Sequence, residues 1–445
     1  MPVEVAGELH RLDVALVEDP PVVVVGGLAR EDAGDASIGT VPWRIGDSTP
    51  WEMEPMVSGS RGSVLVVGGG IGGLTAAIAL RRAGFVVRVL ERAETLRPVG
   101  AGLTVQPNAL SALDHVDLGD AVARAGTRLC HGILRSWRGR ELSHMRLDEV
   151  APGLSAPVGI HRATLQGLLL DALPEEVVRL GAEVTAVAQE GDEVVATLAG
   201  GATLRADLLV GADGIHSMVR RSLHGDQPPR YAGYTCWRGV LARRDGWPHD
   251  RVTESWGPGR RVGLVPVDGD RLYWFAVLDA PRGGRDTGGA SAAVQEMVGG
   301  WFDPVPAIVA ATPEADIRRD DIEDRPPLEV WGCGRITLLG DAAHPMTPNM
   351  GQGACQAIED AVVLAHLLGH GDPVAALRSY EARRRPRTRW FVESSWRIGA
   401  TAQWHSGPLR CLRDAGMQLV PDALAARTVR KSWRFDLPDG LQPAE

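Results

Sequence analysis

The residues with the greatest chemical potential in this chain lie between positions 338 and 361, in the run LLGDAAHPMTPNMGQGACQAIEDA. Asp341 follows a short apolar run, which predicts a carboxylate at the carboxyl end of a buried strand. Open α/β sheets bind their ligands outside such strand ends. Two prolines stiffen the following loop, and Gly351 and Gly353 let the backbone approach a ligand closely. Apolar residues then recur at helical spacing, so the segment predicts a helix whose N-terminal N–H groups face a pocket.

A second glycine-rich turn lies near the start of the folded pattern. Residues 64–67 are an apolar run that predicts a strand, and GGGIGG follows them directly, before a helical pattern. The glycines concerned are Gly68, Gly70, Gly72 and Gly73. Their spacing suits a tight turn, a close approach of pyrophosphate, and helix–strand packing. Glu91 and Arg92 end the next predicted strand, where a carboxylate binds a ribose hydroxyl. The pattern predicts a bound dinucleotide without distinguishing FAD from NAD.

Two further runs place charged residues beside predicted turns. In IHRATLQ, Arg162 begins a predicted helix, from which it would reach a pyrophosphate or form a surface ion pair. In LLVGADGIHSMVR, Asp213 follows a buried strand, and Ser217 and Arg220 come after it. An Asp-Gly pair alone is also a common turn. The combination of strand, Asp-Gly, Ser and Arg is more specific.

Taken together, these runs resemble the FAD-dependent class A flavoprotein monooxygenases, the aromatic-hydroxylase family. The likeness extends from residue 63 to about residue 371, and YTCWRG and the C-terminal part resemble the branch with salicylate hydroxylase, urate hydroxylase and zeaxanthin epoxidase. The resemblance implies that FAD is bound by Gly68, Gly70, Gly72, Gly73, Glu91, Arg92, Arg162, Asp213, Asp341, Gly351 and Gly353.

The resemblance also implies the reaction. NADPH or NADH would reduce FAD, O2 would add to the flavin, and the flavin hydroperoxide would insert one oxygen atom into an aromatic or polyunsaturated small molecule. Hydroxylation is favoured over epoxidation, and the alternative is an FAD-dependent oxidoreductase or oxidase without oxygen insertion. The sequence shows no nucleophile elbow, metal-ligand cluster or paired catalytic carboxylates. The reactive chemistry is therefore expected to come from the cofactor.

The substrate region is expected between residues 230 and 325, where aromatic runs predict an antiparallel sheet. Alternation places Tyr231 and Trp237 on one strand face, and the resemblance favours this face as the pocket wall, although both side chains would equally suit sheet packing. Arg220 would hold a cosubstrate phosphate or an anionic substrate, or pair with an acidic neighbour. His344 would tune flavin hydrogen bonding or support its loop. No catalytic base is assigned.

The predicted fold class is α/β with an α+β substrate lobe. A Rossmann-like FAD-binding domain (61–229 and 325–375) would contain a parallel sheet and a β-meander, and residues 230–324 would form an inserted antiparallel-sheet substrate domain. Residues 376–445 would form C-terminal helices that brace both parts and carry their arginines on a solvated face. Residues 1–58 are acidic and rich in Gly and Pro, which predicts a flexible extension. A native start at Met53 or Met56 is a further hypothesis.

The overall composition excludes several classes of protein. The 445 residues carry a net charge of −9, which disfavours a nucleic-acid-binding surface. Five scattered cysteines suit reduced thiols better than disulfides or zinc. No apolar run reaches the roughly 18 residues of a membrane-spanning helix, and no secretory signal precedes the fold. We therefore expect a cytoplasmic monomer or homodimer without integral membrane association.

Overall fold

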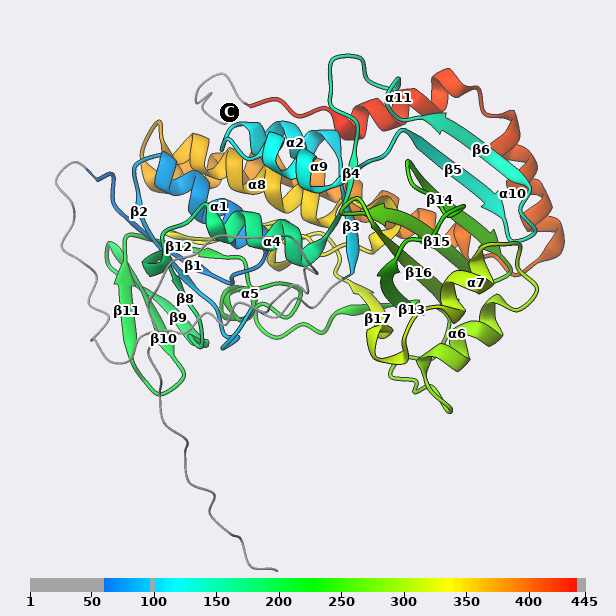
Figure 1. Ribbon diagram of the computed structural model, residues 1–445. Coiled ribbons are helices and arrows are strands. Elements are labelled where there is room, and N and C mark those ends of the chain that lie inside the picture. Colours follow the sequence, from blue (N-terminus) through cyan, green and yellow to red (C-terminus); the bar gives the residue numbers. More distant parts are fainter. Residues whose placement is uncertain (1–59, 97–100, 438–445) are drawn as a thin grey trace, which may run out of the picture. The chain divides into compact units, whose positions relative to one another are not determined.

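The computed structural model describes residues 60–96 and 101–437 (Figure 1). The predicted extension over residues 1–58 and the hypothetical start at Met53 or Met56 lie outside the described residues. None of the described helices combines the length and the apolar character needed to cross a membrane.

A parallel sheet of five strands forms the centre of the dinucleotide-binding part. Its order is β18 (Ile336–Leu338), β12 (Leu208–Gly211), β1 (Ser63–Val67), β2 (Val86–Leu90) and β8 (Val178–Arg179). The strand residues are almost all buried, because helices and a small antiparallel sheet pack against the parallel sheet. The helices concerned include α1 (Ile71–Arg82), α2 (Pro107–Asp114), α4 (Arg162–Asp171) and α8 (Gly353–Leu368). Helices α1, α2 and α8 lie side by side in Figure 1.

Smaller elements complete this part. The predicted β-meander is a separate antiparallel sheet of β9 (Val184–Glu190), β10 (Glu193–Leu198) and β11 (Thr203–Ala206). A second small sheet contains β3 (Gly102–Val105), β7 (Val158–His161) and β4 (Thr127–Arg128), while α3 (Gly119–Ala125) and α5 (Met218–His224) are short helices. The architecture is the α/β fold with a parallel sheet that the sequence predicts.

The antiparallel sheet of the substrate part is larger than predicted. Its seven strands run in the order β17 (Arg318–Asp324), β13 (Arg230–Ala242), β16 (Arg271–Asp279), β15 (Arg260–Val267), β14 (Arg251–Gly257), β5 (His131–Ser136) and β6 (Glu141–Arg146). The last two come from residues that the sequence analysis assigned to the FAD-binding domain, so the boundary at residue 230 does not delimit this sheet. Strand β5 joins through parallel pairing with β14, a long-range contact that local sequence patterns do not show.

Helices α6 (Ala290–Val298) and α7 (Val305–Ala310) pack on one face of this sheet. Their buried residues Val294, Met297 and Ile308 belong to one hydrophobic cluster with Trp237 and Trp274 of the sheet. This face of the sheet is consequently filled, and its other face is left for a cavity.

The C-terminal helices contact both parts, as predicted. Helix α9 (Pro373–Ala402) packs on α8, α10 (Gly407–Leu419) on β6, and α11 (Asp422–Trp433) on α2. The expectation that their arginines form a solvated face is wrong for Arg384 and Arg413, which are buried. Arg384 lies among the carboxylates of Glu359 and Asp360, and Arg413 pairs with Asp414.

Candidate active site

A cavity of about 980 Å³ lies between the carboxyl ends of the parallel strands and the antiparallel sheet. Ten of the eleven residues predicted to bind the cofactor line it: Gly68, Gly70, Gly72, Glu91, Arg92, Arg162, Asp213, Asp341, Gly351 and Gly353. The eleventh, Gly73, lies behind the wall. The structure thus brings together segments that are far apart in the sequence.

The glycine-rich turn has the shape that a pyrophosphate requires. Gly68 has a φ of 109°, and a Cβ there would lie 2.4 Å from the carbonyl oxygen of Ala212. A Cβ on Gly73 would lie 2.0 Å from the carbonyl oxygen of Gly68. A Cβ on Gly70, in contrast, would meet nothing within 4 Å. Gly68 and Gly73 therefore allow the turn and the packing of α1. Gly70 leaves open space beside the N-terminus of the helix, where anions are stabilised.

Glu91 links the end of β2 to this turn. Its carboxylate accepts hydrogen bonds from the N–H groups of Gly69 (2.7 Å) and Ala93 (2.9 Å). Each carboxylate oxygen keeps a second lone pair, so Glu91 remains able to accept a ribose hydroxyl. Arg92 and Arg162 add positive charge to the same wall.

Asp213 has one satisfied and one unsatisfied oxygen. Its Oδ2 accepts from the N–H groups of Met218 (2.7 Å) and Val219 (3.1 Å) at the start of α5. Its Oδ1 is buried without a partner in the described part of the chain. Burial raises the pKa of this carboxyl, which these hydrogen bonds oppose. A buried orphan oxygen in the cavity wall fits a site that a ligand donor completes.

Asp341 faces the cavity from a short 3-10 turn, Gly340–Ala342. Its carboxylate takes no hydrogen bond from the described residues. The surrounding protein desolvates the carboxyl and raises its pKa, although the charges of His344 and Arg162 act in the opposite direction. An unpaired carboxylate at a strand end suits the hydroxyl groups of a bound ligand.

The start of α8 is held by a chain of amide side chains that the sequence analysis missed. Gly351 adopts the left-handed conformation (φ 62°) before the helix, and Gln106 Nε2 donates to the Met350 carbonyl oxygen (2.8 Å). Gln352 Nε2 in turn donates to Gln106 Oε1 (2.7 Å). Gln106 and Gln352 line the cavity, and no local pattern marks them because their contacts join residues far apart in the chain.

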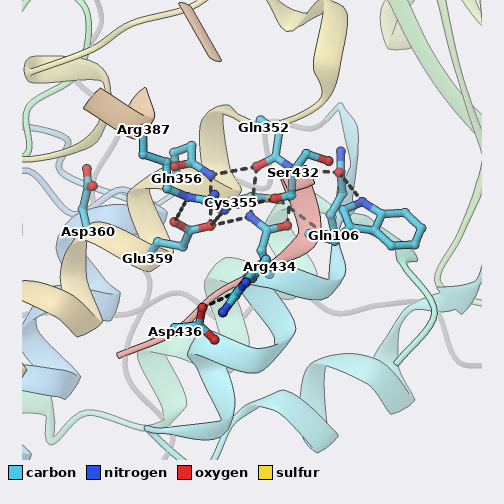
Figure 2. Close-up of polar contacts among 12 residues, drawn as sticks. Gln106, Gln352, Cys355, Gln356, Glu359, Asp360, Arg387, Ser432, Arg434 and Asp436 are labelled. Carbon is cyan, nitrogen blue, oxygen red and sulfur yellow. Dashed lines mark hydrogen bonds and ion pairs between the residues drawn. The ribbon is translucent and has the colours of Figure 1, made fainter. Parts of the chain in front are cut away.

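Behind this loop the amides continue into a buried ion cluster, as Figure 2 shows. Gln356 Nε2 donates to Gln352 Oε1 (2.9 Å) and to Glu359 Oε1 (3.0 Å). Arg387 Nε donates to Glu359 Oε2 (2.7 Å), and Arg384 also pairs with Glu359. Burial alone would raise the pKa of Glu359, but these arginines lower it. The cluster positions the loop from outside the cavity.

Arg220 and His344, two of the predicted pocket residues, do not line the cavity. Arg220 is buried and its Nη1 donates to the carbonyl oxygens of Ala342 and Ala343 (both 3.2 Å). Burial and the charge of Arg325 lower its pKa to about 10. His344 turns away from the cavity, and its Nε2 lies 2.6 Å from Asp360 Oδ2. Both residues hold the loop of Asp341, so neither the phosphate role nor the flavin role is supported.

The predicted pocket face of β13 is also wrong. Tyr231 donates to the Ala280 carbonyl oxygen (2.6 Å), and Trp237 packs under α6 and α7 with its Nε1 donating to Asp286 (2.8 Å). The cavity is lined by Cys236 and Arg238 of the opposite face. Alternation separated the two faces, but the helices packed on one of them decide which face is left open.

The sheet contributes a buried polar group that the sequence analysis did not find. The side chain of Arg261 on β15 lines the cavity and is 2 % exposed. Its Nη1 donates to Glu254 Oε1 (3.1 Å) and its Nη2 to Asn349. Its Nε is buried without a partner in the described residues. Arg238, whose Nη1 donates to Asp320, lies on the same wall.

Apolar side chains make up much of the remaining wall on this side of the cavity. They include Leu129, Leu147, Val265, Phe275, Val277 and Met346. The chamber thus combines an apolar lining with two arginines and one carboxylate, a composition typical of small-molecule sites.

Comparisons with known proteins agree with this geometry. The family model described as FAD binding domain matches residues 61–395. The aurachin C monooxygenase/isomerase of Stigmatella aurantiaca is 44% identical over 84% of this chain and 98% of its own. An FAD-dependent urate hydroxylase of Klebsiella pneumoniae subsp. pneumoniae is 38% identical over 74% of this chain and 87% of its own.

Two solved structures have a fold similar to that of this chain. Klebsiella pneumoniae HpxO complexed with FAD and uric acid has a TM-score of 0.79 and 32% identity, covering 83% of this chain and 96% of that one. A salicylate hydroxylase substrate complex, at 24% identity, has a TM-score of 0.71 over 85% of this chain and 97% of that one, which shows likeness of fold alone.

Proposed function

Because the chain belongs to the FAD binding domain family and is, like its relatives, an FAD-dependent monooxygenase, we propose that it hydroxylates a largely apolar aromatic or polyunsaturated small molecule. Epoxidation is the second possibility, because zeaxanthin epoxidase of Solanum lycopersicum is 39% identical over 73% of this chain, although the match spans 52% of that protein. The observation that carries the proposal is the apolar chamber whose wall includes the buried guanidinium of Arg261.

We propose that FAD is held along the wall formed by the glycine turn, Glu91, Arg162, Asp213 and Asp341. The open space at Gly70 and the orphan oxygen of Asp213 support this placement. When bound, FAD supplies the redox chemistry that activates O2, with NADPH or NADH as electron donor. The N–H groups at the start of α8 would stabilise negative charge on the cofactor.

The sheet side of the cavity would orient the substrate. The guanidinium of Arg261 would donate to a carbonyl, phenolate or ring nitrogen of the substrate, since hydrogen bonds from a charged donor are stronger than neutral ones. The contacts of Arg261 with Glu254 and Asn349 hold its guanidinium in place. The apolar wall around it would exclude water from the reacting atoms. A substrate with one acceptor and an otherwise apolar surface fits this chamber best.

The proposal also includes a reducing compartment. All five cysteines lie in the described residues as free thiols, and Cys355 is buried with its pKa raised to about 12, mainly by burial. Free thiols suit the cytoplasm, where disulfides are rare. We propose a cytoplasmic monomer or homodimer, which sedimentation of the purified protein would distinguish.

The function is tested with labelled oxygen. FAD-loaded protein is incubated with NADPH or NADH under ¹⁸O2 and a panel of phenols, N-heteroaromatics and polyenes, and mass spectrometry detects label in products. Incorporation of one labelled atom supports the proposal, and Arg261→Met should reduce it while FAD stays bound. If NAD(P)H is consumed and every compound yields only H2O2, an oxidase without oxygen insertion becomes the better description.

A further inference from the structure

Exposed apolar side chains are gathered in one region of the surface. Of the seven large hydrophobic side chains that are exposed in the described residues, six lie in two segments: Leu154, Leu409, Leu412, Leu419, Val420 and Leu424. Five of these belong to α10, α11 and their connection. Leu154 lies in the loop after β6, whose Val150 carbonyl oxygen accepts from Arg430 of α11. A cluster of this kind marks an interaction surface, whereas scattered exposed residues do not.

Helix α10 buries charged residues and exposes leucines, the reverse of an ordinary surface helix. Its buried residues are Arg413 and Asp414, which pair with one another at 2.8 Å. Arg413 Nη1 also donates to the carbonyl oxygens of Thr401 and Ala402 (3.1 and 3.2 Å). The leucines therefore project outward, with Leu412 exposed by 69% and Leu419 by 80%. With the charged pair inward, these leucines are in contact with water unless an apolar partner covers them.

Positive charge accompanies this apolar surface. Apart from the buried pair Arg413–Asp414, residues 407–434 contain Arg410, Arg427, Arg430, Lys431 and Arg434 against Asp422, in a chain whose net charge is −9. Arg430, Lys431 and Arg434 line a cleft of about 590 Å³ between α9 and α11 with the exposed Arg383, and the carboxylates of Glu359 and Asp436 line it as well. These helices therefore carry a net positive charge, unlike the chain as a whole.

The same helix forms part of the cavity wall. Thr428, Val429, Ser432 and Trp433 of α11 line the cavity. Leu424 is exposed by 55% and precedes Thr428 by four positions, so the two lie on the same side of the helix. Pro157, at the end of the loop that carries Leu154, lines the cavity as well. The two segments with exposed apolar side chains therefore adjoin the wall of the active site.

We propose that α10, α11 and the loop over residues 150–157 form a docking surface for an anionic lipid bilayer, through which an apolar substrate enters the cavity. Exposed leucines next to arginine or lysine side chains are features of helices that lie in the membrane interface. Basic residues add attraction to anionic headgroups. Entry of the substrate from the bilayer rests on the proposed function, but bilayer docking does not.

Vesicle binding tests the docking surface. FAD-loaded full-length protein is sedimented with phosphatidylcholine vesicles that contain or lack phosphatidylglycerol. Binding should be stronger with phosphatidylglycerol and should weaken with added salt. Leu412→Glu combined with Leu419→Glu should lower binding at least about tenfold. Val330→Glu is the matched control, because Val330 is exposed by 55% and lies outside the surface; it should bind like the unmodified protein.

Charge is tested separately. Arg427→Glu combined with Lys431→Glu should lower binding to anionic vesicles about fivefold or more, whereas Arg124→Glu on α3, whose side chain is 75% exposed, should not. FAD absorbance and circular dichroism verify folding of each variant. Absence of binding by the unmodified protein, or equal losses in the test and control variants, would overturn the proposal.

Two measurements separate the remaining explanations. If the protein sediments as a dimer without vesicles, and Leu412→Glu with Leu419→Glu makes it monomeric, the surface belongs to a second copy and the bilayer proposal fails. Oxygen labelling with detergent-dispersed substrate tests the proposed function without a bilayer. If the protein binds vesicles but no product is labelled, the proposed function fails and the docking proposal stands. If product is labelled but the protein does not bind vesicles, the docking proposal fails and the proposed function stands.

Discussion

Nε2 of His344 lies 2.6 Å from Oδ2 of Asp360, in the interior between the Asp341 loop and helix α8. The other oxygen of Asp360, Oδ1, lies 2.5 Å from Nε of Arg384. The loop histidine and a C-terminal arginine therefore share one buried carboxylate. Through it, helix α9 is connected to the loop that carries Asp341.

This arrangement predicts an acid-sensitive contribution to stability. Burial alone would raise the pKa of Asp360, but His344 and Arg384 lower it from 3.8 to about 2. Because the folded-state pKa lies below the unfolded one, the contribution is present above pH 3.8 and is lost as the pH falls towards 2. Asp360→Asn should cost about 3–5 kcal/mol at neutral pH. Urea unfolding should show this difference shrinking over that acid range; a constant difference would contradict the assignment.

Arg220 is predicted to act on FAD without touching it. Arg220→Met leaves the carbonyl oxygens of Ala342 and Ala343 without their donor, at a cost of about 1–3 kcal/mol. The neighbouring Asp341 would lose its position, so the Kd for FAD should rise about tenfold. Titration of the apoprotein with FAD measures it. Arg221→Met, a change at the exposed neighbour, is the control, and equal FAD affinity in both variants would refute the positioning role.

Asp341 is predicted to contribute to FAD binding through its carboxylate. The side chain is exposed towards the cavity, so its oxygens can accept hydrogen bonds from hydroxyl groups of the cofactor. Asp341→Asn should lower flavin occupancy, because the amide keeps one acceptor oxygen instead of two, and Asp341→Ala should lower occupancy further. Flavin absorbance of the purified variants, with thermal unfolding in the presence and absence of FAD, measures the loss. Unchanged occupancy in both variants would exclude the assigned contact.

Adjacent residues of β13 are predicted to have separate effects, because they lie on opposite faces. Arg238→Met alters the cavity wall and should raise KM for the substrate and the fraction of NAD(P)H converted to H2O2. Trp237→Phe alters the packing under α6 and α7 and should cost about 1–2 kcal/mol of stability with little change in KM. Steady-state kinetics and urea unfolding of the two variants provide the comparison. The opposite pattern would restore the pocket face inferred from the sequence.

The turns and strand ends that line the cavity can be recognised in the sequence alone. GGGIGG, the strand-end carboxylates and the glycines before α8 are local patterns, because a turn, a strand end and a helix start each depend on a few adjacent residues. Their order along the chain therefore predicted the α/β fold and the residues that meet at the cavity. Only the assembled fold could place Arg261 there, since its neighbours Glu254 and Asn349 come from another strand and from the loop before α8.

Tertiary structure also decided which residues face the cavity. Alternation along β13 defined two faces, but the packing of α6 and α7 closed the one with Trp237 and left the one with Arg238 open. The buried Arg220 donates to the carbonyl oxygen of Ala342, far along the chain. The buried His344 lies beside Asp360 of the adjoining helix. A buried polar group must find its partner wherever the fold supplies one. Such pairings depend on long-range contacts, and a sequence pattern does not contain them.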